Sequence, residues 1–365
     1  MRTRLATVLI VAVFLLGGCR APSEPVAPGP SAATAGRLEG SSHGLPPAAS
    51  APSPTSPPLT SLRFPITAIA GSTLLLPLGR ESGLFARYGL DVDIITMAGS
   101  SLAVQSMLAG DLPLSAVSSA AVVEADLAGA QIDIIAGVVN RANNMVMAVP
   151  EVATMADFRG RRVGVPRLGD SNDFFIRYAL RQAGLEPDRD LQILQIGLNS
   201  EMLTAMQNGA IEGGAMSSPT TIRARRLGYR QVLDLGAMGI PYQHTTVNVL
   251  RSYLQAQPDV VRRFLQAYIE TIYLFKADKA FTKKVLADFA KTDDEEVLEE
   301  TWELYAEQYL ERVPYPTLEG LQSVLNESLH PEAKTARPEQ FVNTALLDEL
   351  KAAGFFDELR ARYGD

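Results

Sequence analysis

Apolar and polar positions follow two kinds of spacing between residues 63 and 250. Short apolar runs, such as Phe64-Pro-Ile-Thr-Ala-Ile-Ala70 and Leu112 to Val117, are flanked by polar or turn-forming residues. Longer segments, such as Leu74 to Tyr88, carry apolar residues at helical spacing, and Gly89 then stands where a helix ends in the left-handed region. The short runs predict buried strands and the longer segments predict helices. Strands and helices that alternate at this length favour mostly parallel sheets covered on both faces.

From Ser252 onward the pattern is helical. The predicted helices span residues 259–276, 279–289, 293–311 and 317–327, and a final segment ends at Tyr363. Trp302, Tyr305 and Tyr309 form a stripe at helical spacing, which is typical of core packing. The acidic run 293–300 opens its helix, where the macrodipole favours acidic residues, and we expect it to be a solvated face.

The stretch from Ser101 to Gly129 recurs 99 positions further along the chain. Gly110 falls on Gly209, Ala116 on Ala215, Ser118-Ser119 on Ser217-Ser218, and Gly129 on Gly228. Both copies contain a helix-like segment, a Gly turn, a short apolar strand, a Ser-Ser pair and a second helix. Two copies are too few for a solenoid, so we predict a duplicated α/β lobe with a cleft between the copies.

The first 62 residues have the composition of a targeting segment and a tether. Arg2 and Arg4 precede the apolar residues 5–16, and the segment ends in Leu16-Gly17-Gly18-Cys19, which resembles a bacterial lipobox. We therefore expect residues 1–19 to be a signal peptide and Cys19 to carry a lipid. An ordinary signal peptide with an incidental Cys is the alternative. Residues 20–62 are rich in Pro, Ala, Ser and Gly, which predicts a disordered tether.

Composition and charge exclude several functions. The chain has 365 residues and a net charge of −8, with no basic stripe, so nucleic acid is not expected as a partner. Cys19 is the only Cys, and the three His residues share no ligand-like spacing, so we expect no metal site and no cofactor. No Ser-His-Asp set or carboxylate pair stands at a fixed spacing, and we expect no catalytic residues.

The candidate binding residues lie where predicted strands end and helices begin. Open α/β sheets bind ligands beyond the carboxyl ends of their strands, where unpaired backbone N–H groups point outward. These ends, together with two hinge residues, give the candidate set: Ser72, Thr73, Gly99, Ser100, Ser101, Ser118, Ser119, Asn144, Asp170, Ser171, Asn172, Ser217, Ser218 and His244. For each Ser, helix capping without a ligand is the alternative, and for His244 it is a structural role in the hinge.

The segment Gly164-Val-Pro-Arg-Leu-Gly169-Asp170-Ser171 has a superficial likeness to a phosphate-binding loop. It carries Asp170 where that motif needs Lys, and a carboxylate there would repel phosphates, so we reject a nucleotide site. Asp170 either caps its own helix or selects an amine or pyrimidine-like ligand. Arg141 and Arg167, at the hinge and the cleft edge, either pair with an anionic ligand or belong to the solvated surface.

Three segments resemble the extracellular solute-binding proteins of bacterial ABC importers, in the branch for nitrate, sulfonates, taurine and thiamine precursors. They are Glu81-Ser-Gly-Leu-Phe-Ala-Arg-Tyr-Gly-Leu-Asp-Val-Asp93, Met155-Ala-Asp-Phe-Arg-Gly-Arg-Arg-Val-Gly-Val165 and Pro258-Asp-Val-Val-Arg-Arg-Phe-Leu-Gln-Ala267. The resemblance covers roughly residues 64–330. The family usually carries Gly-x-x-Asp after each Gly turn, whereas Gly110 is followed here by Asp111-Leu-Pro. The resemblance therefore implies a fold and a transport role, and it says little about the ligand.

The implied fold is an α/β, type II periplasmic-binding-protein fold. Two doubly wound lobes would be joined by a two-strand hinge at residues 143–145 and 241–246, with a helical C-terminal region. Residues 63–142 and 243–365 would form lobe 1, and residues 143–242 would form lobe 2. The first of the Ser-Ser pairs would then belong to lobe 1 and the second to lobe 2.

The implied function is a receptor that closes over a small solute and delivers it to a membrane permease. We expect an exported, lipid-anchored monomer that is not an enzyme. The alternatives are an enzyme of pyrimidine or menaquinone synthesis on the same fold, and a ligand-sensing domain that feeds a signalling receptor. The enzymes work inside cells, and the pyrimidine synthase relies on a Cys-rich motif, whereas no Cys follows position 19 here.

Overall fold

The computed structural model describes residues 59–328 and 330–364. The predicted signal peptide, the lipidation at Cys19 and most of the predicted tether lie outside the described residues. The tether prediction extends too far at its C-terminal end, because strand β1 (Thr60–Ile66) begins inside residues 20–62. Leu62 and Phe64 of this strand are buried, so the apolar pattern of a strand starts a few residues before the Phe64 run.

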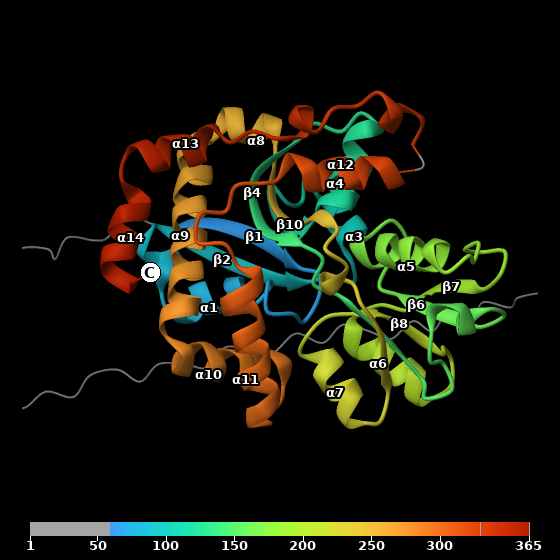
Figure 1. The fold of residues 1–365 in the computed structure, drawn as a ribbon. Helices are drawn as coiled ribbons and strands as arrows, with labels where there is room; N and C mark the ends of the chain where they lie inside the picture. The colour runs from blue at the N-terminus through green and yellow to red at the C-terminus, as the bar shows by residue number, and fades with distance from the viewer. Residues whose placement is uncertain (1–58, 329, 365) are drawn as a thin grey trace, which may run out of the picture. The chain divides into compact units, whose positions relative to one another are not determined.

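The strands form three sheets (Figure 1). In the first, β1 pairs in parallel with β2 (Leu90–Thr96). In the second, β10 (Pro241–Leu250) lies between β3 (Leu114–Ser118) and β4 (Ile132–Arg141) and is antiparallel to both. The third has the order β7-β6-β8-β5-β9, with bounds Gln192–Gln195, Arg162–Val165, Gly213–Met216, Met145–Ala148 and Arg230–Asp234. We use "first lobe" for the part that carries β1–β4 and β10, and "second lobe" for the part that carries β5–β9.

The prediction of mostly parallel sheets is wrong for two strands. β10 runs against both of its neighbours, and β5 runs against β8 and β9. β5 and β10 are the strands that stand next to the two connections between the lobes. An apolar run indicates a buried strand but carries no information about its direction. The sequence pattern therefore does not show that β5 and β10 are antiparallel to their neighbours.

Helices follow most strands and make up nearly all of the C-terminal region. The first lobe contains α1 (Leu75–Glu81), α2 (Leu84–Arg87), α3 (Ser100–Leu108) and α4 (Ser119–Leu127), and the second contains α5 (Ser171–Gln182), α6 (Asn199–Gln207) and α7 (Thr220–Arg226). The C-terminal helices are α8 (Arg251–Ala256), α9 (Pro258–Ala277), α10 (Lys279–Ala290), α11 (Glu295–Glu303), α12 (Leu318–Glu327), α13 (Ala345–Ala352) and α14 (Phe355–Tyr363). Among the described residues, no helix is both long and apolar enough to cross a membrane.

Two predicted helices are interrupted in the structure. The predicted helix from Leu74 to Tyr88 is divided into α1 and α2 by Gly83, whose φ of 73° lies in the left-handed region. The predicted helix 293–311 changes at Leu304 into a π-helix that spans Leu304–Tyr309. Neither interruption alters the apolar spacing strongly enough to be read from the sequence. Gly89, with a φ of 71°, has the left-handed conformation that was predicted for it.

The duplicated stretch is present as the same succession of elements at the predicted offset. α3, β3 and α4 in the first lobe correspond to α6, β8 and α7 in the second. The paired turn glycines, Gly110 with Gly209 and Gly129 with Gly228, all have positive φ, which explains why glycine occupies them.

A buried carboxylate ties three helices of the first lobe together. Glu270 on α9 has a fully buried side chain, and it accepts hydrogen bonds from Arg87 and Tyr88 at the end of α2 and from Arg362 and Tyr363 on α14. Burial alone raises the pKa of Glu270, but the hydrogen bonds from Arg87, Tyr88 and Tyr363 outweigh it, so the pKa lies below its ordinary value. Ionised Glu270 therefore stabilises the fold.

Replacing Glu270 with Gln should lower the free energy of unfolding at pH 7 by about 2 kcal/mol, because two guanidinium groups lose their charged partner. Since the folded pKa is depressed, the wild-type contribution is present above the unfolded pKa and is lost as the pH falls through the folded value. Urea denaturation should therefore show the difference between the two proteins shrinking on acidification. The exposed Glu339→Gln variant is the control, and an equal loss in both variants would contradict the assignment.

Candidate functional site

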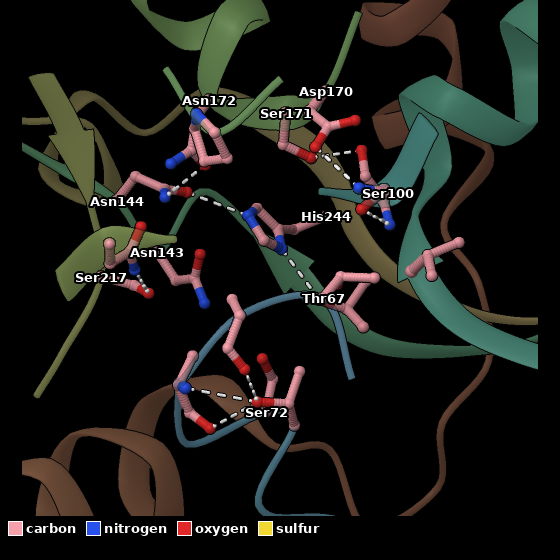
Figure 2. A pocket seen from close by; sticks show the side chains of 18 of the residues that line it. Thr67, Ser72, Ser100, Asn143, Asn144, Asp170, Ser171, Asn172, Ser217 and His244 are labelled. Carbon is pink, nitrogen blue, oxygen red and sulfur yellow. Dashed lines mark hydrogen bonds between the residues drawn. The ribbon is translucent and has the colours of Figure 1, made fainter. Parts of the chain in front are cut away.

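A polar cavity of about 60 Å³ lies between the two lobes (Figure 2). Ten of the predicted binding residues line it: Ser72, Thr73, Ser100, Ser118, Asn144, Asp170, Ser171, Asn172, Ser217 and His244. They come from the carboxyl ends of strands in both lobes, from β10, and from the connection between β4 and β5. Thr67, Asn143, Asn199 and Thr245 also line the cavity, and the sequence analysis did not select them.

Four predicted residues do not line the cavity. The hydroxyl of Ser119 donates to the carbonyl of Gln243, and the hydroxyl of Ser218 pairs with that of Thr221. Ser101 contacts the second lobe outside the cavity. Gly99 has a φ of 84° and precedes α3. In each Ser-Ser pair only the first serine reaches the cavity, because the second is the start of the next helix or turn and points away from it.

In each copy of the repeat, the first residue of the first helix forms a hydrogen bond with the end of the strand in the same copy. In the first copy, the hydroxyl of Ser100 accepts from the backbone N–H of Ser118 at 3.1 Å. In the second copy, the side-chain amide of Asn199 donates to the hydroxyl of Ser217 at 3.0 Å. Ser100 and Asn199 are 99 positions apart, so the repeat itself was the signal that would have identified Asn199 as a cavity residue.

The carboxylate of Asp170 connects the lobes. Its Oδ2 accepts from the N–H of Ser100 at 2.7 Å, and its Oδ1 accepts from the N–H of Ser101 at 2.8 Å and the hydroxyl of Ser101 at 2.6 Å. Asp170 precedes α5, but its side chain makes no hydrogen bond to that helix. The predicted capping of its own helix is therefore wrong, because the side chain caps α3 of the other lobe instead. Burial raises the pKa of Asp170, against the opposing effect of these hydrogen bonds.

A chain of hydrogen bonds crosses the cavity wall from β10 to β8. The hydroxyl of Thr245 meets Nδ1 of His244 at 2.9 Å, and Nε2 of His244 meets Oδ1 of Asn144 at 2.9 Å. The amide of Asn144 donates to Asn172 at 2.9 Å, and Asn172 donates to the carbonyl of Ala215 at 2.6 Å. Because Asn144 uses its amide nitrogen to donate to Asn172, its Oδ1 faces His244 and must accept from the ring. The imidazole proton is therefore on Nε2. Burial lowers the pKa of His244 to about 3, so the ring is neutral at pH 7.

An aromatic residue of the C-terminal region closes one side of the site. The hydroxyl of Tyr305 receives a hydrogen bond from the amide of Asn143 at 3.1 Å. Its ring lies against Gly71, where an added Cβ would come within 2.2 Å of the ring. Tyr305 and Tyr309 are buried, as expected for core packing. Tyr305 also contacts Asn143, which lines the cavity.

The cavity lining carries little charge. Asp170 is its only acidic residue, and no Lys or Arg belongs to it. Arg141 and Arg167, both considered as anion partners from the sequence, lie outside the lining, and Arg141 is exposed. Among the described residues, no group of three or more His, Cys, Asp and Glu side chains is arranged to hold a metal ion.

The sheets, the inserted antiparallel strands and the polar cavity between them define the fold class of two-lobed solute-binding proteins. Residues 74–277 match the family model described as NMT1/THI5 like, which is more than half of the chain. The chain therefore belongs to the NMT1/THI5-like family.

Relatives by sequence are binding proteins. A binding protein of Brucella abortus (strain 2308) is 26% identical over 227 residues, which cover 60% of this chain and 69% of the relative. The bicarbonate-binding protein CmpA of Synechococcus elongatus is 25% identical over 248 residues, 58% of this chain and 54% of CmpA. This chain thus spans about half the length of CmpA.

Solved structures confirm the predicted fold class. The periplasmic nitrate-binding protein NrtA from Synechocystis PCC 6803 superposes with a TM-score of 0.66 at 16% identity, covering 82% of this chain and 90% of NrtA. The alkanesulfonate-binding protein SsuA from Xanthomonas axonopodis pv. citri gives 0.64 at 16% identity, covering 80% and 98%. At this level of identity the likeness concerns the fold.

Replacing Asp170 with Ala should loosen the contact between the lobes, because the N–H groups of Ser100 and Ser101 lose their acceptor. We expect the free energy of unfolding to fall by about 1–3 kcal/mol and the radius of gyration in small-angle scattering to increase. The exposed Asp111→Ala variant, at the turn after α3, should match the wild type. Identical scattering of both variants would show that Asp170 does not hold the lobes together.

Replacing His244 with Asn should reduce the acid sensitivity of the protein. The folded pKa of His244 lies below its unfolded value, so its contribution is present above the unfolded pKa near 6.5 and is lost as the pH falls toward 3. Between pH 7 and pH 5 the wild type should lose up to about 2 kcal/mol more unfolding free energy than the variant. Denaturation curves that stay parallel over this interval would contradict the buried, neutral state of the ring.

Proposed function

We propose that this chain is the solute-binding receptor of an ABC importer, which closes its two lobes over a small solute and delivers it to a membrane permease. The cavity is the main observation that supports this proposal, because one small polar space is lined by strand ends from both lobes. A solute in that space would contact both lobes at once and favour their closed arrangement. The relatives CmpA, NrtA and SsuA are named for three different solutes, which supports the receptor role without selecting one of them.

Contacts between the lobes at the cavity and at its rim support the closing motion. The hydroxyls of Ser118 and Ser171 pair across the cleft. At the rim, Arg181 on α5 pairs with Glu327 on α12 at 2.7 Å, and Arg225 on α7 pairs with Glu300 on α11 at 2.5 Å. Surface ion pairs of this kind contribute little free energy, so the lobes can separate at low cost.

The acidic run that the sequence analysis assigned to a solvated face takes part in these rim contacts. Arg226 on α7 pairs with Asp294 and Glu296 at the start of α11. The run is on the surface, as predicted, and it also lies opposite an arginine-rich helix of the other lobe. These pairs would orient the lobes as they meet, because opposite charges attract over several ångströms before contact.

The full proposal includes the features predicted from the sequence outside the described residues. The chain would be exported, and Cys19 would anchor it by a lipid at the outer face of a membrane, close to the permease. Residues 63–142 and 243–365 would move as one lobe and residues 143–242 as the other. Bending would occur at residues 143–145 and 241–246. We propose a monomer, because one chain supplies every residue of the cavity lining.

The receptor role predicts that a solute compacts the protein. The full chain, freed of small molecules by dialysis, should decrease in radius of gyration and increase in melting temperature when the dialysable fraction of the growth medium is added. Small-angle scattering and thermal denaturation measure both effects. The Ser217→Ala variant should need about three- to tenfold more of that fraction, since it loses a cavity hydroxyl. The exposed Ser200→Ala variant is the control, and an unchanged response of the Ser217 variant would remove Ser217 from the site.

A further inference from the structure

Two amide oxygens in the cavity wall have no partner within the protein. Asn143 and Asn199 are 3% and 2% exposed, and both line the cavity. Their amide nitrogens are used, one by the hydroxyl of Tyr305 and the other by the hydroxyl of Ser217. Neither Oδ1 meets a hydrogen-bond donor among the residues that the structure describes. Buried acceptors are rarely left unpaired, because each one costs free energy when it leaves water.

The other amide, imidazole and carboxyl groups of the wall are already engaged. His244, Asn144 and Asn172 bond to one another and to Thr245 and the backbone. Both oxygens of Asp170 are occupied by N–H and hydroxyl donors. The two asparagine oxygens are therefore acceptors that remain free to bind hydrogen-bond donors of a solute.

The wall carries no cationic side chain that would compensate a negative charge. No Lys or Arg belongs to the lining, and His244 is neutral because burial lowers its pKa to about 3. Helix N-termini often bind anions, but side-chain carboxylates already occupy those of α3 and α6. Asp170 accepts from the first N–H groups of α3, and Glu201 accepts from the N–H of Leu198 before α6. Apart from hydroxyl groups, an anion would meet the two amide oxygens and one buried carboxyl group, and these disfavour it.

The wall does not favour a cation either. A solute ammonium group would need a carboxylate oxygen that is free to accept from it. The only carboxyl group of the lining is Asp170, and its oxygens are taken. The cavity of about 60 Å³ is also far below the ~300–1,000 Å³ of pockets that hold drug-sized ligands. The matching solute is therefore uncharged and has few heavy atoms.

We propose that the cavity binds an uncharged small solute of the carboxamide or urea type, whose N–H groups donate to Oδ1 of Asn143 and Oδ1 of Asn199. This assignment rests on the proposed receptor function and narrows it, because it excludes nitrate, bicarbonate and sulfonates as solutes. The same two oxygens explain how the wall distinguishes molecules of equal shape. Acetamide and acetate differ there by two N–H donors and one charge, and urea and nitrate differ by four N–H donors and one charge within one planar outline.

Isothermal titration calorimetry on the full chain tests the assignment with matched probes. Acetamide is compared with acetate, acetone and methylammonium, and urea is compared with nitrate. We expect acetamide or urea to bind at least about tenfold more tightly than each of the other probes, because only they supply uncharged N–H donors. Bicarbonate and methanesulfonate should give no heat of binding under the same conditions.

Variants show whether the two oxygens carry the effect. Asn143→Ala and Asn199→Ala should each weaken binding of the preferred probe by about five- to tenfold or more, and the exposed Asn208→Ala variant at the end of α6 should not. The comparison of probes on the wild type needs no variant, so a folding defect in Asn143→Ala leaves the test intact.

Three outcomes would overturn the assignment. They are tighter binding of acetate, nitrate or methylammonium than of the amide probes, equal binding of acetone and acetamide, and no binding of either amide probe. An anion that binds and compacts the protein would sink this assignment and leave the receptor role standing. The receptor role itself fails only if the dialysable fraction of the medium neither compacts nor stabilises the chain.

Discussion

The structure depends on one buried carboxylate that crosses from the second lobe to the first. Asp170 cannot stay buried without donors, and Ser100 and Ser101 at the start of α3 supply three of them. The contact requires glycine at position 99, because an added Cβ would lie 2.6 Å from the Asp170 carboxylate. It also brings Ser171 within reach of Ser118, so the cavity has walls from both lobes. The close approach of the two lobes and the polar lining therefore have a common cause.

Duplication supplies a symmetric scaffold, and two differences between the copies make the site asymmetric. Each copy places its first helical residue against its own strand end, yet that residue is Ser100 in one copy and Asn199 in the other. The start of α3 is capped by a side chain of the opposite lobe, whereas the start of α6 is capped locally by Glu201. The first copy thus contributes the contact between the lobes, and the second contributes an amide whose oxygen faces the cavity. A fully symmetric pair would supply only one of these two functions.

The sequence was sufficient for the elements and for the position of the cleft, because apolar spacing and the 99-residue offset are local signals. It was not sufficient for partners that come from distant segments. Asp170 stands where a helix cap is expected, and only the tertiary arrangement shows that it caps a helix 70 residues earlier. Ser119 and Ser218 lie one position from cavity residues, and their side chains turn to Gln243 and Thr221 instead. Asn143 and Asn144 are adjacent in one connection, and only the tertiary arrangement shows that both line the cavity.

These contacts also explain how closure can depend on a solute. When the lobes meet, the Asp170 carboxylate and the N–H groups of Ser100 and Ser101 replace their hydrogen bonds to water with hydrogen bonds to each other. Such a replacement gives only a modest net gain in free energy. The same movement buries the amide oxygens of Asn143 and Asn199, each at a cost of about 1–3 kcal/mol if no donor meets it. The gain and the cost are of similar size, so the open and closed arrangements of the proposed receptor would be nearly balanced. A solute that donates to both oxygens removes the cost and shifts the equilibrium by its differential affinity for the closed arrangement.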